Sequence, residues 1–258
     1  MSIDIGDCVS RNSYHNDTIF KVIKINNGLY ILKGLEIRLI ADSPFNDLKK
    51  EENIVIKNDD SLSILENNFE SRNEYFYLPA KILHIDSDEE YLQRCLNFYK
   101  KNGVYAIGKK IKEENIADQV KGLLVEFRPD IIVITGHDAY YAKKGDASNI
   151  NNYRNSLNFV HAVKVARNYE KSHEKLVIIA GACQSNYEEI IKAGANFASS
   201  PKRVNIHALD PAIIATTIAL TERSKEIDLI NLLNKTKYKE EGMGGLICNG
   251  LMYVGYPR

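Results

Sequence analysis

Two stretches decide the fold of this chain: IIVITGHD at Ile131–Asp138 and LVIIAGACQS at Leu176–Ser185. Each starts with an uninterrupted apolar run and ends abruptly in small and polar residues. Such runs are typical of interior strands of a parallel sheet, because helices cover both faces of that sheet. The two stretches therefore predict buried parallel strands, each of which carries a reactive side chain, His137 or Cys183, just beyond its end.

Strand and helix patterns alternate along the chain around these two stretches. In residues 88–101, apolar side chains recur at positions i, i+3, i+4 and i+7, which is the spacing of a helix stripe. The remaining patterns predict strands at 81–86, 104–108 and 204–208, and helices at 113–127, at 155–170 and from Asp210 onward. This alternation predicts a doubly wound α/β domain with a mostly parallel sheet over residues 79–258.

The first part of the chain has a different, β-rich pattern. Two strand-like runs at 19–25 and 29–34 flank an Asn-Asn-Gly turn, which is a hairpin signal. Residues 35–40 alternate between apolar and polar side chains and predict a third strand. We therefore expect a small SH3-like β-barrel domain over residues 1–45. Residues 46–78 are polar and predict a linker.

Composition narrows the possible functions. The 258 residues include 34 basic and 34 acidic side chains, so the formal net charge is zero, unlike that of a basic nucleic-acid-binding surface. No apolar run approaches the roughly 20 residues of a membrane span, and the N-terminus lacks signal-peptide features. The four cysteines form no CxxC pair, which argues against a disulfide framework or a zinc site. No metal or organic cofactor is indicated, and neither a membrane nor a nucleic-acid partner is expected.

The strand ends predict a group of reactive side chains. If the strand order is 2-1-3-4, Asp86, His137 and Cys183 lie at the ends of neighbouring strands and share one rim of the sheet. A thiol is a strong nucleophile as its thiolate, and a nearby imidazole can take the proton or stabilise the charge. His207, at the end of the expected strand 204–208, is a further candidate for this rim. The other three cysteines, Cys8, Cys95 and Cys248, have packing explanations.

Residues at this rim could also form an oxyanion hole and a pocket for a charged substrate side chain. Peptide N–H groups at Gly136 and Cys183 could form an oxyanion hole, and such a donor is typically worth a few kcal/mol. A carboxylate at the adjacent strand end, Asp86 or Asp88, could bind a cationic side chain of a substrate.

The order of these blocks resembles that of the caspase-like peptidases, which carry His-Gly after one strand and Ala-Cys after the next. A longer similarity is to the YabG family of sporulation-specific peptidases and covers nearly the whole chain. It rests on the segments Ile5–Asp7, Leu32–Leu35, Ile134–Ala139, Tyr153–Ser156, Ala180–Ser185, Ala193–Pro201 and Val204–Pro211.

This resemblance implies a caspase-like fold and a cysteine endopeptidase that cleaves spore-coat and cortex-associated proteins after basic residues, Arg in particular. It implies Cys183 as nucleophile and His137 as catalytic imidazole, in a protein made in the cytoplasm of the sporulating cell and associated with the spore coat. The chain departs from the wider clan in having His-Asp in place of His-Gly. Gly181, two residues before the cysteine, cannot supply charge, so the acidic pocket is expected at Asp86 first and at Asp88 second.

Without the resemblance, the residues are compatible with other functions. Another Cys-His hydrolase would use the same pair on small amides, and a non-catalytic coat-assembly protein would use the N-terminal domain for binding. A peptidase could also cleave its own linker, where Lys49, Lys50 and Arg72 offer basic sites.

Overall fold

The structure is a computed structural model that describes residues 2–51, 54 and 74–257. The chain divides into two compact units, residues 1–61 and 62–258. Most of the predicted linker, residues 52–53 and 55–73, lies outside the described residues, as does Arg72.

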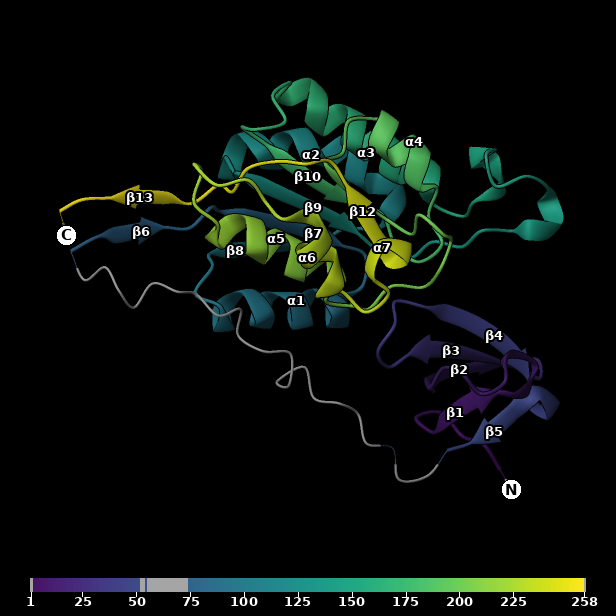
Figure 1. Cartoon of the computed structure of the whole chain (residues 1–258). Helices are drawn as coiled ribbons and strands as arrows, with labels where there is room; N and C mark the ends of the chain where they lie inside the picture. The colour runs from purple at the N-terminus through teal and green to yellow at the C-terminus, as the bar shows by residue number, and fades with distance from the viewer. Residues whose placement is uncertain (1, 52–53, 55–73, 258) are drawn as a thin grey trace. The chain divides into compact units, whose positions relative to one another are not determined.

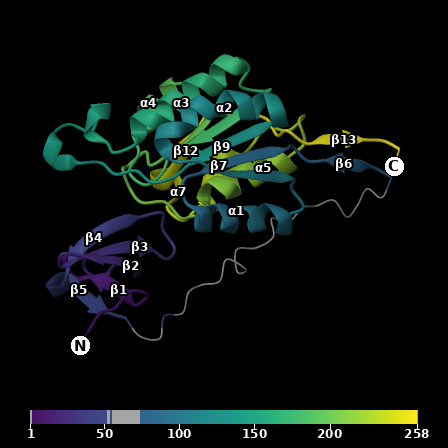
Figure 2. The same cartoon turned by 180° about the vertical axis from the view of Figure 1, so that it is seen from behind.

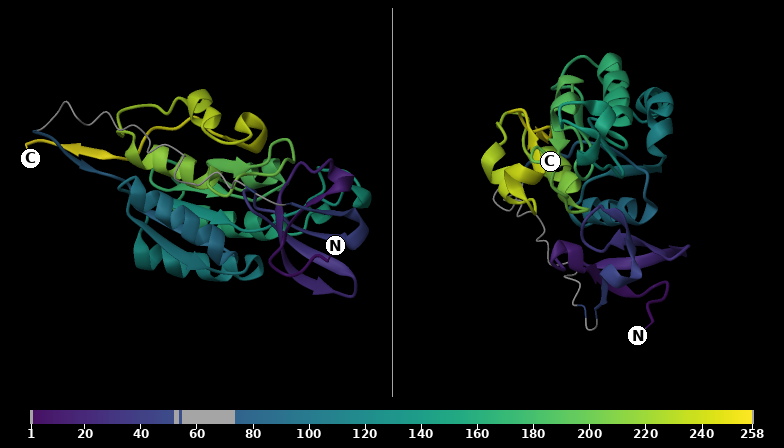
Figure 3. Two further views of the ribbon diagram at one scale, coloured as in Figure 1. Left: turned by 90° about the horizontal axis from the view of Figure 1, so that it is seen from below. Right: turned by 90° about the vertical axis from the view of Figure 1, so that its right-hand side faces the viewer.

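The first unit contains a five-stranded antiparallel sheet, in the order β4-β3-β2-β1-β5. The strands lie together in the purple part of the chain (Figure 3). The predicted hairpin is confirmed: Asn27 and Gly28 both have positive φ, which is the conformation of a type I′ turn. The strands are β1 (Cys8–Arg11), β2 (Phe20–Asn26), β3 (Leu29–Gly34), β4 (Ile40–Pro44) and β5 (Leu48–Lys50).

Two details of this sheet differ from the expected pattern. The predicted strand at 35–40 is wrong, because the backbone turns back on itself there: Leu39 N donates to Ile37 O and Gly34 N donates to Leu39 O. The strand begins only at Ile40. The sheet also extends through β5, which pairs with β1, so Lys49 and Lys50 lie in a strand.

The second unit is an α/β domain built on a six-stranded sheet, in the order β12-β11-β10-β9-β7-β8. The pairs from β8 through β11 are parallel and only β12 is antiparallel, so the sheet is mostly parallel. Its strands are β7 (Ile82–Asp86), β8 (Ala106–Lys110), β9 (Ile131–Thr135), β10 (Val177–Ala180), β11 (Phe197–Ser199) and β12 (Met243–Gly245).

Helices cover both faces of this sheet because the residues of its strands alternate between two buried cores. Ile131 and Val133 of β9 pack in one core with helices α1, α5 and α6, whereas Ile132 and Ile134 pack in the other with α2, α3 and α4. The two layers lie on opposite sides of the sheet in Figure 1. The helices are α1 (Glu89–Lys101), α2 (Glu113–Phe127), α3 (Ser156–Tyr169), α4 (Tyr187–Lys192), α5 (Asp210–Leu220), α6 (Leu229–Asn234) and α7 (Lys239–Gly242).

The fifth parallel strand is not where the sequence pattern predicts it. The strand is β11, at Phe197–Ser199, and not residues 204–208. Phe197 and Ala198 enter the two opposite cores, as a central strand requires. The backbone of Val204 and Ile206 instead bonds to the segment around Cys183, which leaves it unavailable for a strand ladder.

A short two-stranded ribbon joins distant parts of this unit. Strand β6 (Phe76–Leu78) pairs antiparallel with β13 (Tyr253–Gly255), next to the C-terminus. The ribbon projects from the end of the sheet opposite to the strand ends that carry His137 and Cys183, and both Figure 1 and Figure 2 show it.

Candidate active site

The carboxyl ends of β7, β9 and β10 meet at one edge of the sheet. In the register of the sheet, Asp86 of β7 pairs with Thr135 of β9, and Ile134 of β9 pairs with Ala180 of β10. The strand order is β8-β7-β9-β10, which meets the condition 2-1-3-4 on which the sequence analysis based the shared rim. The segments that follow these three strands therefore start side by side, as the sequence analysis predicts.

His137 is held through both its main chain and its ring. Its N–H donates to Glu113 Oε1 at 2.7 Å, and its carbonyl accepts from Asn155 Nδ2 at 2.8 Å. Nε2 of the ring lies 3.3 Å from Asp88 Oδ2, and the Tyr91 ring approaches edge-on with centroids 5.9 Å apart. Nδ1 is buried and has no hydrogen-bond partner among the described residues. The ring is thus fixed while one of its nitrogens stays unused.

A glutamate side chain lies close to Gly136. Glu113, the first residue of α2, accepts from Ser87 Oγ at 2.6 Å as well as from the His137 N–H. A Cβ at position 136 would lie 2.5 Å from Glu113 Oε1 and 2.8 Å from Ser87 Oγ. Glycine therefore lets one carboxylate join the ends of β7 and β9.

Cys183 lies in a tight, buried turn. Ser185 Oγ accepts from Ala182 N at 2.9 Å, which closes the turn around the cysteine. The Cys183 side chain has no exposed surface, and its Sγ lies 3.3 Å from the Ile206 N–H. The thiol in turn donates to the Ile206 carbonyl oxygen, 3.8 Å away, so the backbone of Ile206 holds the sulfur as both acceptor and donor.

Asp138 links the histidine segment to the cysteine segment. Its Oδ1 accepts from Ala139 N at 2.8 Å and Asn155 N at 2.7 Å. Its Oδ2 accepts from Ser156 Oγ at 2.5 Å and from Ser185 Oγ at 2.9 Å. Burial raises the pKa of this carboxyl, although the four hydrogen bonds oppose that effect. Asp138 thus joins the residue after His137 to the turn that contains Cys183.

Asp86 is part of a different, fully buried chain of hydrogen bonds. Its Oδ1 accepts from Asp88 N at 2.9 Å, and its Oδ2 accepts from Thr135 Oγ1 at 2.8 Å. Behind Thr135, the ring of His84 lies 3.0 Å from Thr135 Oγ1 and 2.8 Å from Tyr99 Oη. The two carboxylates of the predicted pocket therefore have separate surroundings: Asp86 lies against the sheet, and Asp88 lies against His137.

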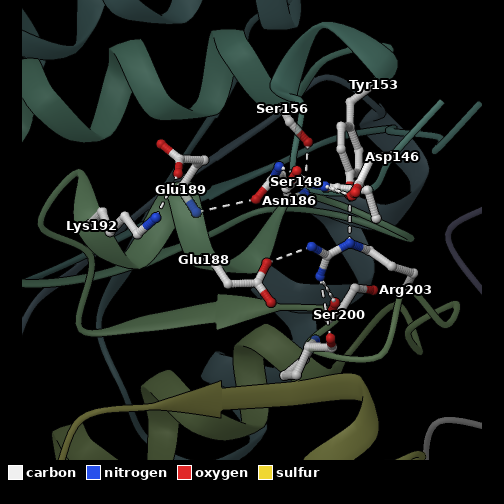
Figure 4. Close-up of polar contacts among 12 residues, drawn as sticks. Asp146, Ser148, Tyr153, Ser156, Asn186, Glu188, Glu189, Lys192, Ser200 and Arg203 are labelled. Atoms are coloured by element: carbon white, nitrogen blue, oxygen red, sulfur yellow. Dashed lines mark hydrogen bonds and ion pairs between the residues drawn. The ribbon is translucent and has the colours of Figure 1, made fainter. Parts of the chain in front are cut away.

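An arginine joins the loops beyond Cys183. Arg203 Nε donates to Tyr153 Oη at 2.6 Å, and the guanidinium also contacts Glu188 and the carbonyl of Ser200 (Figure 4). Tyr153 packs in turn on Tyr140, with ring centroids 5.1 Å apart. Arg203 therefore connects the segments 140–153 and 200–203 to Glu188 of helix α4.

The other cysteines and His207 each have their own surroundings in the fold. Cys95 is buried in α1 with its thiol 3.4 Å from the Ala208 carbonyl, and Cys8 lies in β1. Burial, helped by the charge of Glu226, raises the pKa of the Cys248 thiol to about 11, so this thiol stays protonated at neutral pH. His207 Nδ1 accepts from Leu209 N at the start of α5.

Several residues of the rim have no signal in the sequence. Glu113 reaches the site only through tertiary contacts, and nothing in its local pattern sets it apart, whereas Ser87 and Ser185 lie beside the strand-end residues and their hydrogen bonds could not be read from the sequence. The His-Asp departure at Asp138 is the one local sign of the network described above. Within the described residues, no group of three metal-binding side chains occurs, and no helix has the length and apolar character needed to cross a membrane.

The fold and the site define an α/β protein with a thiol, an imidazole and carboxylates at the carboxyl edge of a parallel sheet. Comparison with known proteins supplies the family. The sequence profile of the YabG peptidase U57 family matches residues 4–71 and 52–257. The chain is 43% identical over 286 aligned positions to the sporulation-specific protease YabG of Bacillus subtilis (strain 168), covering 100% of this chain and 99% of that protein. No solved structure matches. The chain belongs to the YabG peptidase family and is a peptidase of sporulation.

Proposed function

We propose that this chain is a cysteine endopeptidase that cleaves spore-coat and cortex-associated proteins after basic residues, Arg in particular. The observation that carries the proposal is the position of His137 and Cys183. They follow the adjacent parallel strands β9 and β10, and the Asp138–Ser185 hydrogen bond joins their segments. The family assignment favours a peptidase over a small-amide hydrolase or a non-catalytic binding protein.

The proposed reaction passes through a thioester. Cys183 Sγ attacks the carbonyl carbon of the scissile bond, His137 protonates the leaving amine, and water then releases the acyl group. Peptide N–H groups at Gly136 and Cys183 would stabilise the oxyanion. Because the Cys183 side chain is buried in this structure, acylation requires that the thiol become accessible to the substrate.

The proposed fold relationship is to the caspase-like peptidases. The support is the order of the elements: the histidine segment follows one central strand, the Ala-Cys segment follows the next, and helices cover both faces of the sheet. A caspase-like site needs no metal or organic cofactor, and none is included in the proposed reaction.

The preference for Arg is assigned to Asp86, with Asp88 as the second choice. Asp86 has no exposed surface in this structure, so a substrate guanidinium could pair with this carboxylate, which Thr135 and the Asp88 N–H orient, only if the rim opens. Asp86→Asn keeps the size of the side chain and removes its charge. We expect kcat/KM for Arg substrates to fall relative to substrates with an uncharged residue at that position. If the preference for Arg survives, the pocket lies elsewhere.

Two cysteine variants test the nucleophile. Cys183→Ala is expected to abolish cleavage of a fluorogenic Arg peptide, and a thiol alkylator should do the same to the unmodified protein. Cys248→Ala is the matched control, because its thiol is protonated at neutral pH. Cleavage that persists in folded Cys183→Ala, judged by circular dichroism, would refute the assignment.

Cleavage within the chain and association with the spore coat belong to the same proposal. Lys49 and Lys50 lie in β5, and Lys50 Nζ is 2.7 Å from Asp7 Oδ2, so cleavage there would require β5 to open. Intact-mass measurement of the active protein beside Cys183→Ala shows whether the chain cuts itself. Fractionation of spores shows whether it remains with the coat.

A further inference from the structure

Asp88 uses its two carboxylate oxygens for two different tasks. Oδ1 accepts from Glu90 N at 3.0 Å and Tyr91 N at 3.3 Å, which makes Asp88 the N-cap of α1. Oδ2 lies 3.3 Å from His137 Nε2. The first contact fixes the carboxylate at the start of a helix, so the second is made by a pre-oriented group.

The contact determines which nitrogen of His137 carries hydrogen. An ionised carboxylate can only accept, so a neutral imidazole facing it places its hydrogen on Nε2. Nδ1 is then left with its lone pair, and it is the nitrogen that is buried without a hydrogen-bond partner among the described residues. The main-chain hydrogen bonds of His137 with Glu113 and Asn155 fix its backbone, so the ring meets Asp88 from a fixed position.

We propose that Asp88 is a positioning residue that holds His137 in the Nε2–H form, so that Nδ1 is the atom that takes and returns the proton in catalysis. The inference rests on the proposed Cys183–His137 mechanism and assigns Asp88 to the histidine, not to the substrate pocket. It leaves Asp86 as the carboxylate for the pocket.

In the proposed reaction, one proton moves on and off a single nitrogen, His137 Nδ1. As the bond from Cys183 Sγ to the carbonyl carbon forms, the thiol proton moves to His137 Nδ1. As the carbon–nitrogen bond breaks, that same proton passes from Nδ1 to the leaving amine. The hydrogen on Nε2 stays in place throughout, and Asp88 stabilises the positive charge of the intermediate imidazolium.

The test is Asp88→Asn, which preserves the helix cap because Asn and Asp are equally good N-cap residues. It removes the charge that selects the Nε2–H form. We expect kcat to fall by about 10²-fold or more with KM nearly unchanged, as is typical when general acid–base catalysis is lost. The ring ¹⁵N shifts of His137, assigned by comparison with His137→Gln, should show Nε2–H in the unmodified protein and a mixture of tautomers in the variant.

Asp228→Asn is the matched control. Asp228 caps α6 through a 3.0 Å hydrogen bond from Asn231 N, so the same substitution is made at a helix cap away from His137. This variant should keep both kcat and the His137 spectrum. Asp88→Ser provides a second variant that retains a capping side chain but lacks a carboxylate, and it should show the same loss as Asp88→Asn.

Three results would overturn the inference. One is a wild-type spectrum with hydrogen on Nδ1. Another is an Asp88→Asn variant that matches Asp228→Asn in kcat and tautomer. The third is an increase in KM for Arg substrates at unchanged kcat, which would make Asp88 a substrate-binding residue. Failure of the proposed function is seen separately, as cleavage that persists in Cys183→Ala, whereas the tautomer is read from the spectrum without any activity.

Discussion

Asp138 shows how much a single residue contributes to the arrangement of this site. Its two oxygens accept four hydrogen bonds, two from backbone N–H groups and two from the hydroxyls of Ser156 and Ser185. Ser185 in turn accepts from Ala182 N, next to Cys183. A glycine, which the caspase-like peptidases carry after their histidine, could make none of these side-chain bonds. At the residue scale, the aspartate that follows His137 is explained by the hydrogen bonds that its side chain accepts.

Asp138→Asn should destabilise the protein. The amide offers one acceptor oxygen and an NH₂ group, so either the backbone donors or the two hydroxyls lose an acceptor. A buried donor left without its acceptor costs about 1–3 kcal/mol, so we expect the free energy of unfolding to fall by about 2 kcal/mol. Urea denaturation measures this change. Asp146→Asn, at an exposed carboxylate, is the control, and an equal effect at both positions would contradict the prediction.

The effect of Asp138→Asn should also depend on pH. Because burial raises the pKa of Asp138 above its ordinary value of 3.8, the folded protein keeps this proton to higher pH than the unfolded chain does. The contribution of Asp138 to stability is thus greatest below pH 3.8 and declines as pH rises through the folded-state pKa. The difference in unfolding free energy between the wild type and Asp138→Asn should therefore shrink with rising pH. A constant or growing difference would contradict the assignment.

At the scale of elements, the first residue of α2 holds the ends of two strands. Glu113 accepts from Ser87, just after β7, and from His137, just after β9. Its position follows from the packing of Ile116, Val120 and Leu124 of α2 against the sheet face. Helix packing therefore determines where the histidine main chain lies, and Gly136 provides the space that this requires.

Gly136→Ala and Gly122→Ala should have opposite effects. The new methyl group at position 136 would displace the Glu113 carboxylate and break its bonds to Ser87 and His137. We expect a loss of about 1–3 kcal/mol in unfolding free energy, together with reduced kcat. Gly122 lies inside α2 with no atom within 4 Å of its Cβ position, so alanine should stabilise the helix by about 0.5–1 kcal/mol. Urea midpoints of both variants test this, and destabilisation by both would contradict it.

Many elements follow from local pattern alone. Helix α2 at 113–127 and strand β9 at 131–135 match the predicted ranges. These segments have long or strongly apolar patterns. Strand β11 has three residues, and its pairing with β10 and β12 decides its place more than any local signal does. The expected strand at 204–208 is wrong because its backbone bonds to the Cys183 segment instead.

At the scale of the whole molecule, the two units have separate cores. The first unit buries a small group of side chains, Ile3, Val9, Phe20, Val22, Leu32 and Leu48. The second buries two large groups on the opposite faces of one sheet. The two cores share the strands β7, β9 and β10, so we expect them to unfold together in one cooperative transition.

Core truncations should therefore affect one unit at a time. Phe20→Ala is expected to cost about 3–5 kcal/mol and Ile132→Ala about 2–5 kcal/mol, because each leaves a cavity in a buried core. Hydrogen exchange read by mass spectrometry should show Phe20→Ala losing protection in β2 and β3 while β9 keeps it. Ile132→Ala should show the reverse. Loss of protection in both units from either substitution would contradict the separation of the cores.

The sequence by itself determined the alternation of strands and helices and the placement of Asp86, His137 and Cys183 just at or beyond the carboxyl ends of strands; the strand order that makes those ends neighbours was a condition, which the structure meets. These features depend on apolar periodicity and on chain direction, which local pattern carries. Only the tertiary structure decided that Asp88 and not Asp86 faces His137, that Glu113 holds the histidine main chain, and that the Cys183 side chain is buried beside Ile206. The physical reason is that a side-chain hydrogen bond between residues 20 to 50 positions apart depends on how helices pack on the sheet, and no local pattern records that packing.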